Sequence, residues 1–335
     1  MKKFLFLIYY LLITSGFYAC RNGSSGANKS TKQNPFLPPS TGSLTELILV
    51  LPDHLWTSSV GEITRECFHS PLKGLPQKES LFNIFDINVS QFSSIFKSHK
   101  NILQFISSDS TYLESGRSKW SNDQLYFCVY FQNEKQLMAL LVRRGTEIRK
   151  AFLEKNQIRR VCALQKNRNL AIEKEIKKSY NLSFLIPEGF EVAHAEKDFL
   201  WLRRDISRLN VIANIWVHRQ AYKNKSQMNK SSLIGLRDSI GKTFIKGGRR
   251  DSYMATEMLY DPSIILLNTD PYTLSMKGLW TMENDFLGGG FTSKIFLDQK
   301  NNSLIYAEGF LYSPNQKKRE RILELDAILS TLVFE

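Results

Sequence analysis

The order of strand-like and helical segments in the second half of the chain limits the fold most strongly. Alternating apolar residues predict three strands within residues 182–218 and four more within residues 264–312. A helix separates the two groups of strands, and another follows the last strand. The order βββαββββα predicts an antiparallel sheet covered by two helices, an α+β fold. The helices are marked by apolar stripes at Leu233, Leu236, Ile240 and Phe244 and at Ile322, Leu325, Leu329 and Leu332, the latter opened by Ser313 and Pro314.

Residues 44–178 predict a separate α+β domain, in which strands and helices mix without strict alternation. Strands are expected at residues 46–51, 81–87, 102–107 and 124–131. A long helix capped by Asn133 should follow, with Gly145 inside it, and a second, basic helix should cover residues 158–178. The C-terminal domain is therefore expected to occupy residues 179–335.

The first twenty residues form an export signal. Lys2 and Lys3 precede an unbroken apolar run at residues 4–13. The run is shorter than the roughly 20 residues that a membrane-spanning helix needs. Ala19-Cys20 suits lipoprotein processing, so residues 1–19 are expected to be removed and Cys20 to receive the lipid. A plain secreted product and an uncleaved anchor are the alternatives.

Residues 20–43 predict a flexible tether behind the lipidated Cys20, because they are rich in Ser, Gly, Asn and Pro. Arg21 and Asn22 follow Cys20, where several lipoprotein groups carry acidic signals for retention or surface export. Their identity favours the cell envelope, at the periplasmic face of the outer membrane.

The chain carries a formal net charge of +13, and the excess is concentrated in residues 143–178 and 203–250. Such a balance favours anionic partners. For an exported protein these are anionic lipid, an acidic glycan or an acidic envelope protein rather than nucleic acid. An ordinary solvated surface is the alternative. The residues expected to contact an anion are Arg203, Arg204, Arg219, Lys223, Lys225, Arg249 and Arg250.

The sequence predicts no metal and no cofactor. Its five histidines are far apart and show no metal-ligand spacing. Gly241-Lys242-Thr243 lacks the glycine that a phosphate-binding loop requires five positions earlier. Cys67 and Cys128 are interpreted as core residues, although a single bridge among Cys67, Cys128 and Cys162 stays open.

Catalytic signatures are equally scarce. Glu283 and Asp285 are the best carboxylate pair for acid–base work, beside Gly288-Gly289-Gly290, which is expected to connect two strands. Two acids in a polar hairpin are more often solvated turn residues. The sequence therefore names no catalytic residue.

The C-terminal half resembles the PsbP/Mog1-like sandwich in its element order and in Pro187-Glu188-Gly189 after its first strand. That resemblance implies an assembly factor or binding module and no activity by itself.

Nearly the whole body also resembles uncharacterised lipoproteins of Bacteroidota. The matching segments are residues 75–79, 99–102, 120–124 and 308–329. This resemblance implies envelope location, a palmitate-type membrane anchor and a domain of unknown function. The resulting hypothesis is a non-enzymatic binding or scaffolding lipoprotein, with an envelope hydrolase acting on glycan or peptide as the alternative.

Overall fold

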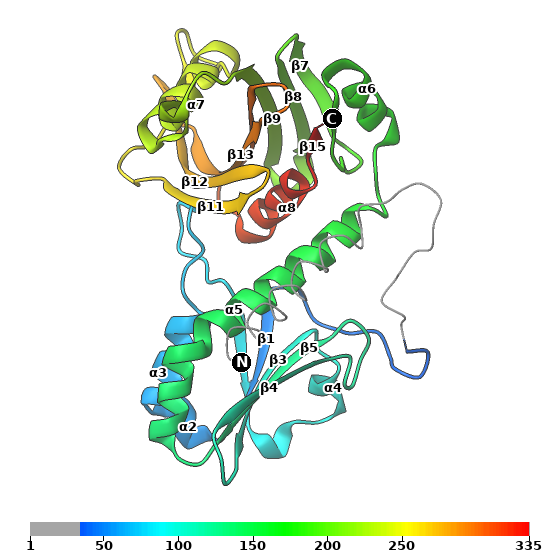
Figure 1. The fold of residues 1–335 in the computed structure, drawn as a ribbon, viewed down its shortest axis with the longest axis vertical. Coiled ribbons are helices and arrows are strands. Elements are labelled where there is room, and N and C mark those ends of the chain that lie inside the picture. Colours follow the sequence, from blue (N-terminus) through cyan, green and yellow to red (C-terminus); the bar gives the residue numbers. More distant parts are fainter. Residues whose placement is uncertain (1–33, 335) are drawn as a thin grey trace. The chain divides into compact units, whose positions relative to one another are not determined.

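The structure, a computed structural model, describes residues 34–334 and divides the chain into two compact units (Figure 1). The first unit contains residues up to 67 and residues 82–155, and the second contains residues 68–81 and 156–335. The expected signal, Cys20 and residues 21–33 of the expected tether lie outside the described residues. The tether was predicted too long, because Asn122 and Lys100 donate hydrogen bonds to the carbonyl oxygens of Leu37 and Gly42 and so hold residues 34–43 on the first unit. Within the described part, no helix is long and apolar enough to span a membrane.

The first unit is built on a five-stranded sheet of order β2-β1-β3-β5-β4. Strands β2, β1, β3 and β5 run parallel, and only β4 at the edge is antiparallel. Strand β1 is apolar and almost wholly buried, as expected for a strand covered on both faces. The strands are β1 (Glu46–Val50), β2 (Asn83–Ile87), β3 (Asn101–Ser107), β4 (Tyr112–Arg117) and β5 (Leu125–Phe131).

Helices cover both faces of this sheet (Figure 1). Helix α3 and the long helix α5 pack closely at Gly145 of α5. A Cβ at this position would lie only 2.7 Å from the Sγ of Cys67 in α3. Glycine is therefore required there by close approach. The helices are α2 (Asp53–Thr57), α3 (Ser59–Phe68), α4 (Ser94–Lys97) and α5 (Glu134–Leu164), with the 3-10 turn η2 (Val89–Gln91) before α4.

Several expectations for this half need correction. Helix α5 continues to Leu164, and a short break precedes α6 (Leu170–Tyr180), so no single helix covers residues 158–178. Strand β4 was not predicted, because its polar sequence gives no apolar alternation. The expected domain boundary after residue 178 falls inside α6, whose Ile172 and Ile176 pack in the core of the second unit.

The second unit is a curled antiparallel sheet of eight strands (Figure 1). Its order is β10-β12-β13-β14-β9-β8-β7, and β11 pairs with the same edge of β12 as β10. The strands are β7 (Glu191–Glu196), β8 (Phe199–Ile206), β9 (Val211–Ala221), β10 (Tyr253–Thr256), β11 (Ser263–Thr269), β12 (Tyr272–Glu283), β13 (Gly288–Asp298) and β14 (Ser303–Tyr312).

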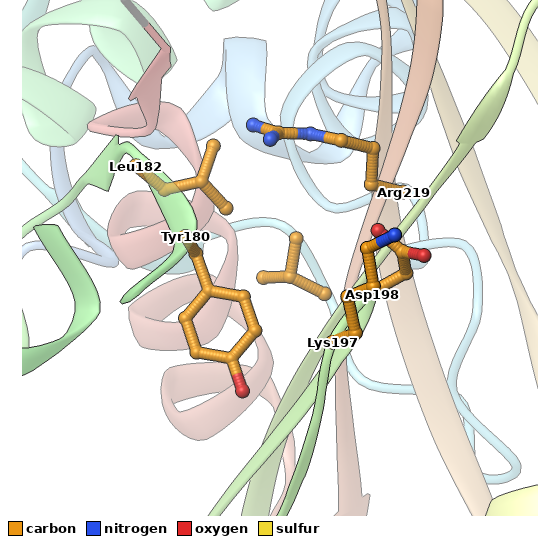
Figure 2. Close-up of a pocket in the computed structure, with 6 residues that line it drawn as sticks. Tyr180, Leu182, Lys197, Asp198 and Arg219 are labelled. Atoms are coloured by element: carbon orange, nitrogen blue, oxygen red, sulfur yellow. The ribbon is translucent and has the colours of Figure 1, made fainter. Parts of the chain in front are cut away.

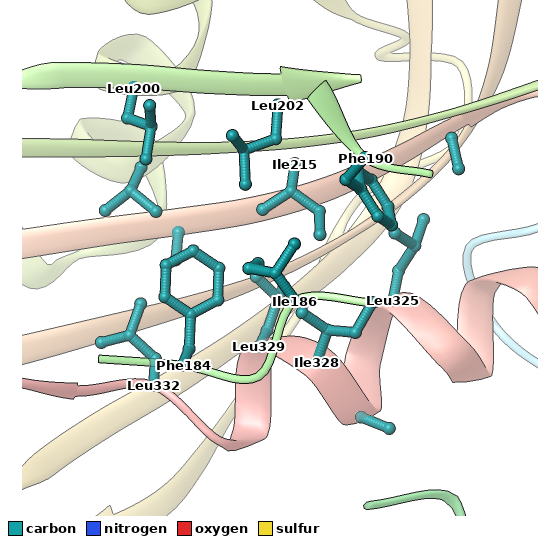
Figure 3. Packing of buried hydrophobic residues seen from close by; sticks show 14 of the residues in the cluster. Phe184, Ile186, Phe190, Leu200, Leu202, Ile215, Leu325, Ile328, Leu329 and Leu332 are labelled. Atoms are coloured by element: carbon teal, nitrogen blue, oxygen red, sulfur yellow. The ribbon is translucent and has the colours of Figure 1, made fainter. Parts of the chain in front are cut away.

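Two helices pack on opposite faces of this sheet, which confirms the expected α+β class. Helix α8 (Arg319–Ser330) covers the face that carries Ile305 and Leu311 of β14, and Figure 3 shows this apolar core. Helix α7 (Lys230–Phe244) covers the face that carries Leu304 and Tyr306. Alternate residues of one strand thus supply two cores. The remaining elements are β6 (Leu182–Ser183), β15 (Val333–Phe334), η3 (Ser207–Leu209) and η4 (Lys225–Met228).

The start of the last helix was predicted incorrectly. Ser313 is buried, and the helix begins only at Arg319. Before it, Glu79 of the loop between α3 and β2 accepts hydrogen bonds from the backbone N–H groups of Lys318 and Arg319 at 2.7 and 3.1 Å. A carboxylate distant in sequence therefore satisfies the helix start in place of a local cap.

A buried ion pair joins α7 to the sheet. The guanidinium of Arg237 donates to both carboxylate oxygens of Glu308 in β14, each at 2.9 Å, and both side chains are fully buried. Arg237 also donates to Thr256 of β10 at 3.0 Å and lies 4.0 Å from the centre of the Phe291 ring. Burial raises the pKa of Glu308, and the charge of Arg237 opposes that rise.

A second polar cluster lies on the opposite face of the sheet. Asp326 of α8 accepts a hydrogen bond from Thr292 at 2.9 Å and lies 3.3 Å from the Nζ of Lys294 and 3.9 Å from that of Lys277. Burial alone would raise the pKa of Asp326. The two lysines and the Thr292 hydroxyl outweigh burial and hold that pKa well below its usual range.

This cluster predicts how stability depends on pH. Because the folded-state pKa of Asp326 is depressed, its carboxylate stabilises the fold above the ordinary value of 3.8, and that stabilisation is lost as pH falls below it. Asp326→Asn should lower the free energy of unfolding by about 3 kcal/mol at pH 7, and the difference should shrink between about pH 4 and pH 2. Urea titration measures both.

Asp251→Asn is the matched control, because that side chain is 83% exposed and pairs with Arg250, which is even more exposed. It should change stability by less than about 0.5 kcal/mol at any of these pH values. A pH-independent difference between wild type and Asp326→Asn would contradict the assignment.

Candidate binding surface at the β12 edge

An open hollow of about 340 Å³ lies beside β12, at the start of β13. We call it the apolar hollow. Its floor includes Leu279 and Trp280 of β12, and its rim includes Tyr260 of the β10–β11 loop and Phe286 of the β12–β13 turn. Pro76 adds a fourth segment. Glu257 and Asp285 supply carboxylates among a mainly apolar lining, a composition typical of binding sites.

Glycines at the start of β13 make this hollow possible. A Cβ at Gly289 would lie 2.1 Å from the carbonyl oxygen of Leu311 and 2.9 Å from the Nε1 of Trp280. A Cβ at Gly290 would lie 2.3 Å from the carbonyl oxygen of Gly74. The expectation that residues 288–290 merely connect two strands was therefore wrong. They belong to β13 and let Trp280 and the loop at Gly74 lie against it.

Exposed apolar side chains gather on this side of the sheet, and two of them, Tyr260 and Phe286, line the hollow itself. Of fifteen large hydrophobic side chains that are exposed in the described chain, seven lie in the β10–β11 loop, in β11 or at Phe286. Phe286 is 91% exposed and Leu259 is 87% exposed. Exposed apolar residues that gather in this way mark interaction sites, whereas scattered ones are ordinary. The other five are Met258, Tyr260, Ile265, Leu266 and Leu267.

Arg249 holds the turn that carries Phe286. Its Nε lies 3.2 Å from a carboxylate oxygen of Asp285, and its guanidinium lies 5.0 Å from the centre of the Phe286 ring. Asp285 also accepts the backbone N–H of Phe286 at 2.8 Å. Asp285, one of the two candidate acids, is thus part of a structural contact, whereas Glu283 ends β12 with an exposed side chain.

A second hollow, near Tyr180 and Arg219, is too small for a ligand (Figure 2). Its volume is about 10 Å³, room for about one water molecule. The backbone N–H of Arg219 donates to the carbonyl oxygen of Asp198 at 2.9 Å, which closes this corner of the sheet.

The structure does not bring the seven expected anion contacts together. Arg203 and Arg204 are neighbours on β8 and point to opposite faces. Arg203 lies 3.4 Å from Asp205, whereas Arg204 lies 3.0 Å from Glu324 of α8 and its side chain is only 12% exposed. Arg204 is therefore committed to an internal ion pair.

The other basic residues lie at different ends of the sheet. Lys223 and Lys225 follow β9, next to the β13–β14 turn, because the N–H of Tyr222 donates to Asn302. Arg249 and Arg250 lie beside the β12–β13 turn, where Asn284 donates to Asp251. Strand β13, with 11 residues, separates the two turns by roughly 36 Å. The basic residues therefore do not form a single patch that could contact one flat anionic surface.

The described residues contain no group of three potential metal ligands from His, Cys, Asp and Glu. Cys67 and Cys128 form no disulfide within the described residues, and Cys128 is buried in β5 as expected. Burial raises the pKa of both the Cys67 and the Cys128 thiol, which lowers their reactivity.

Sequence reasoning missed a contact between Ser80 and His69. The Ser80 hydroxyl lies 2.9 Å from the Nε2 of His69, at the base of the loop that includes Gly74 and Pro76. A nucleophilic serine needs such a neighbour and also a third group that orients the histidine. Among residues 34–334, no group forms a hydrogen bond with the Nδ1 of His69. The contact between Ser80 and His69 therefore serves to link the two ends of the loop.

Comparison with protein families places two domains of unknown function on the chain. Residues 169–331 match the family described as domain of unknown function DUF4837, and residues 40–164 match DUF8532. The two matches fit the uncharacterised family that the sequence resembles. They meet between residues 164 and 169, at the break between α5 and α6. No curated protein sequence matches the chain.

Solved structures with partial similarity include a point mutant of the protein Mog1, at 9% identity and a TM-score of 0.31, covering 46% of this chain and 90% of that one. The Ran-binding protein Mog1p of Saccharomyces cerevisiae matches at 8% identity and a TM-score of 0.31, covering 46% and 89%. The human StarD13 (DLC2) lipid transfer and protein localization domain matches at 10% identity and a TM-score of 0.23, covering 48% and 94%. Scores this low support no functional argument.

Proposed function

We propose that this protein is a cell-envelope lipoprotein whose C-terminal unit is a non-enzymatic binding or scaffolding module. The apolar hollow with its exposed rim carries the binding part of the proposal. Water around Phe286 and Leu259 is released when a partner covers them, which favours association. We rank this function above envelope hydrolysis because Asp285, half of the best acid pair, already holds the Phe286 turn through Arg249.

Envelope location and anchoring rest on the sequence of residues 1–20 alone. In this proposal Cys20 carries the lipid, residues 21–33 tether the folded units, and the protein faces the periplasm at the outer membrane. Partners reached from that position are anionic lipid, an acidic glycan or another envelope protein, and not nucleic acid.

Binding at the hollow is tested with the fluorescent apolar anion 1-anilinonaphthalene-8-sulfonate. Phe286→Ser removes an aromatic ring from the rim, which we expect to weaken dye binding by about 1.4 kcal/mol, or tenfold. Phe85→Ser is the matched control, because Phe85 is 46% exposed in the first unit. Fluorescence titration should show a loss for Phe286→Ser only. Equal affinity of both variants and wild type would place the dye elsewhere and leave the hollow without support.

Anchoring is tested by metabolic labelling with a radioactive fatty acid. Wild-type protein should incorporate label, and Cys20→Ala should not, because the substitution removes the thiol that carries the diacylglyceryl group. Cys162→Ala should label like wild type, since that cysteine lies in α5 of the folded body. Label in Cys20→Ala, or a mature chain that begins at another residue, would refute the lipid anchor.

A further inference from the structure

Strand β11 is an exposed edge strand without charge. It occupies Ser263–Thr269, and its sequence SIILLNT contains no acidic or basic residue. It pairs with β12 on one side. Ile265, Leu266 and Leu267 are 57%, 51% and 46% exposed, so both faces of the strand expose apolar side chains, although Ile264 packs against the core under α7. An open, apolar edge of this kind pairs readily with another strand.

The opposite edge of the same sheet shows how such an edge is normally protected. Strand β7 is fully exposed along its length, but it carries Glu191 and Glu196 at its ends and His194 between them. Its pairing with β8 is also irregular between Val192 and His194. Charges and irregularities discourage strand addition. Strand β11 has one irregularity, between Leu266 and Asn268, which leaves Ser263–Leu266 regular.

We propose that β11 pairs antiparallel with β11 of a second copy of this chain, so that the two eight-stranded sheets join into one. A two-fold axis beside Ile265 sets Ile265 against its own counterpart and Ile264 against Leu266. In this register the flanking acids, Asp261 and Asp270, face Thr269 and Tyr260 of the copy. Ile264, Ile265 and Leu266 therefore meet apolar side chains, Leu267 meets Ser263, and no like charges lie opposite each other.

The available area suits a dimer. Besides β11, the β10–β11 loop contributes Met258, Leu259 and Tyr260 to the same edge, and Phe286 lines the same hollow as Tyr260. Seven such side chains offer roughly 100 Å² of exposed surface each, on the order of 700 Å² together. A standard interface buries about 800 Å² per partner, which is a similar area. Glu257, Asp261 and Asp270 surround this edge, so an anionic bilayer suits it less well than a second copy.

Cysteine cross-linking of the full chain in mild detergent tests this arrangement. The pairing brings residue 265 of one copy next to residue 265 of the other. Ile265→Cys should therefore form a covalent dimer upon oxidation in more than half of the protein. Val142→Cys is the control, because Val142 is 72% exposed on α5. It should stay at the background level that wild type sets through its own cysteines. Equal cross-linking of the two variants would overturn the proposal.

Light scattering gives an independent measure of mass. Wild type at about 50 µM should show twice the mass of one chain, and Leu266→Lys should halve it, because a lysine would then face Ile264 of the copy. Val142→Lys should leave the dimer unchanged. A monomeric wild type would refute the pairing. A dimer that survives Leu266→Lys would move the interface elsewhere. If Leu266→Lys unfolds, as circular dichroism would show, the cross-linking result decides. If these experiments refute the dimer, binding at the apolar hollow is still tested separately by the dye titration of Phe286→Ser.

Discussion

The bidentate ion pair between Arg237 and Glu308 is the interaction on which the second unit depends most. It fixes one helix, α7, on a sheet that curls around it, and Thr256 extends the contact to the edge strand β10. Ser293 donates to the same carboxylate at 2.9 Å, so β13 joins the network. A charge removed from water is tolerated only when its hydrogen bonds are satisfied in this way. The position of β10, and with it the edge where the hollow and β11 lie, follows from this arrangement.

Much of this fold could be predicted from the sequence. The stripe Leu233, Ile240 and the apolar strands near Phe291 and Leu304 carry the periodicities of helix and strand, and burial enforces them. Strands β4 and β7 were not predicted, because their exposed, polar sequences lack that alternation. The start of α8 was predicted wrongly, because its backbone N–H groups donate to Glu79, which lies in a loop more than 230 residues away in the sequence.

The candidate surface was far less predictable. Pro76, Tyr260, Trp280 and Phe286 come from four segments, and only the sheet register brings them to one hollow. Two local signals were present. Met258-Leu259-Tyr260 is an apolar triplet in a loop, and three glycines begin β13. Conversely, the basic residues that drew attention as a group were separated, because neighbours on a strand face opposite ways and Arg204 is paired internally.

A double-mutant cycle on the ion pair tests the central claim most directly. Arg237→Met leaves the buried Glu308 without its cation, and Glu308→Leu leaves the buried Arg237 with only the partly exposed Asp238 at 3.6 Å. Each substitution should cost about 3–5 kcal/mol of unfolding free energy. The double variant replaces both charges with apolar groups and should cost much less than the sum of the two. Urea unfolding of the four proteins gives the coupling energy. Single losses below about 1 kcal/mol that simply add would show that the ion pair does not hold α7 to the sheet.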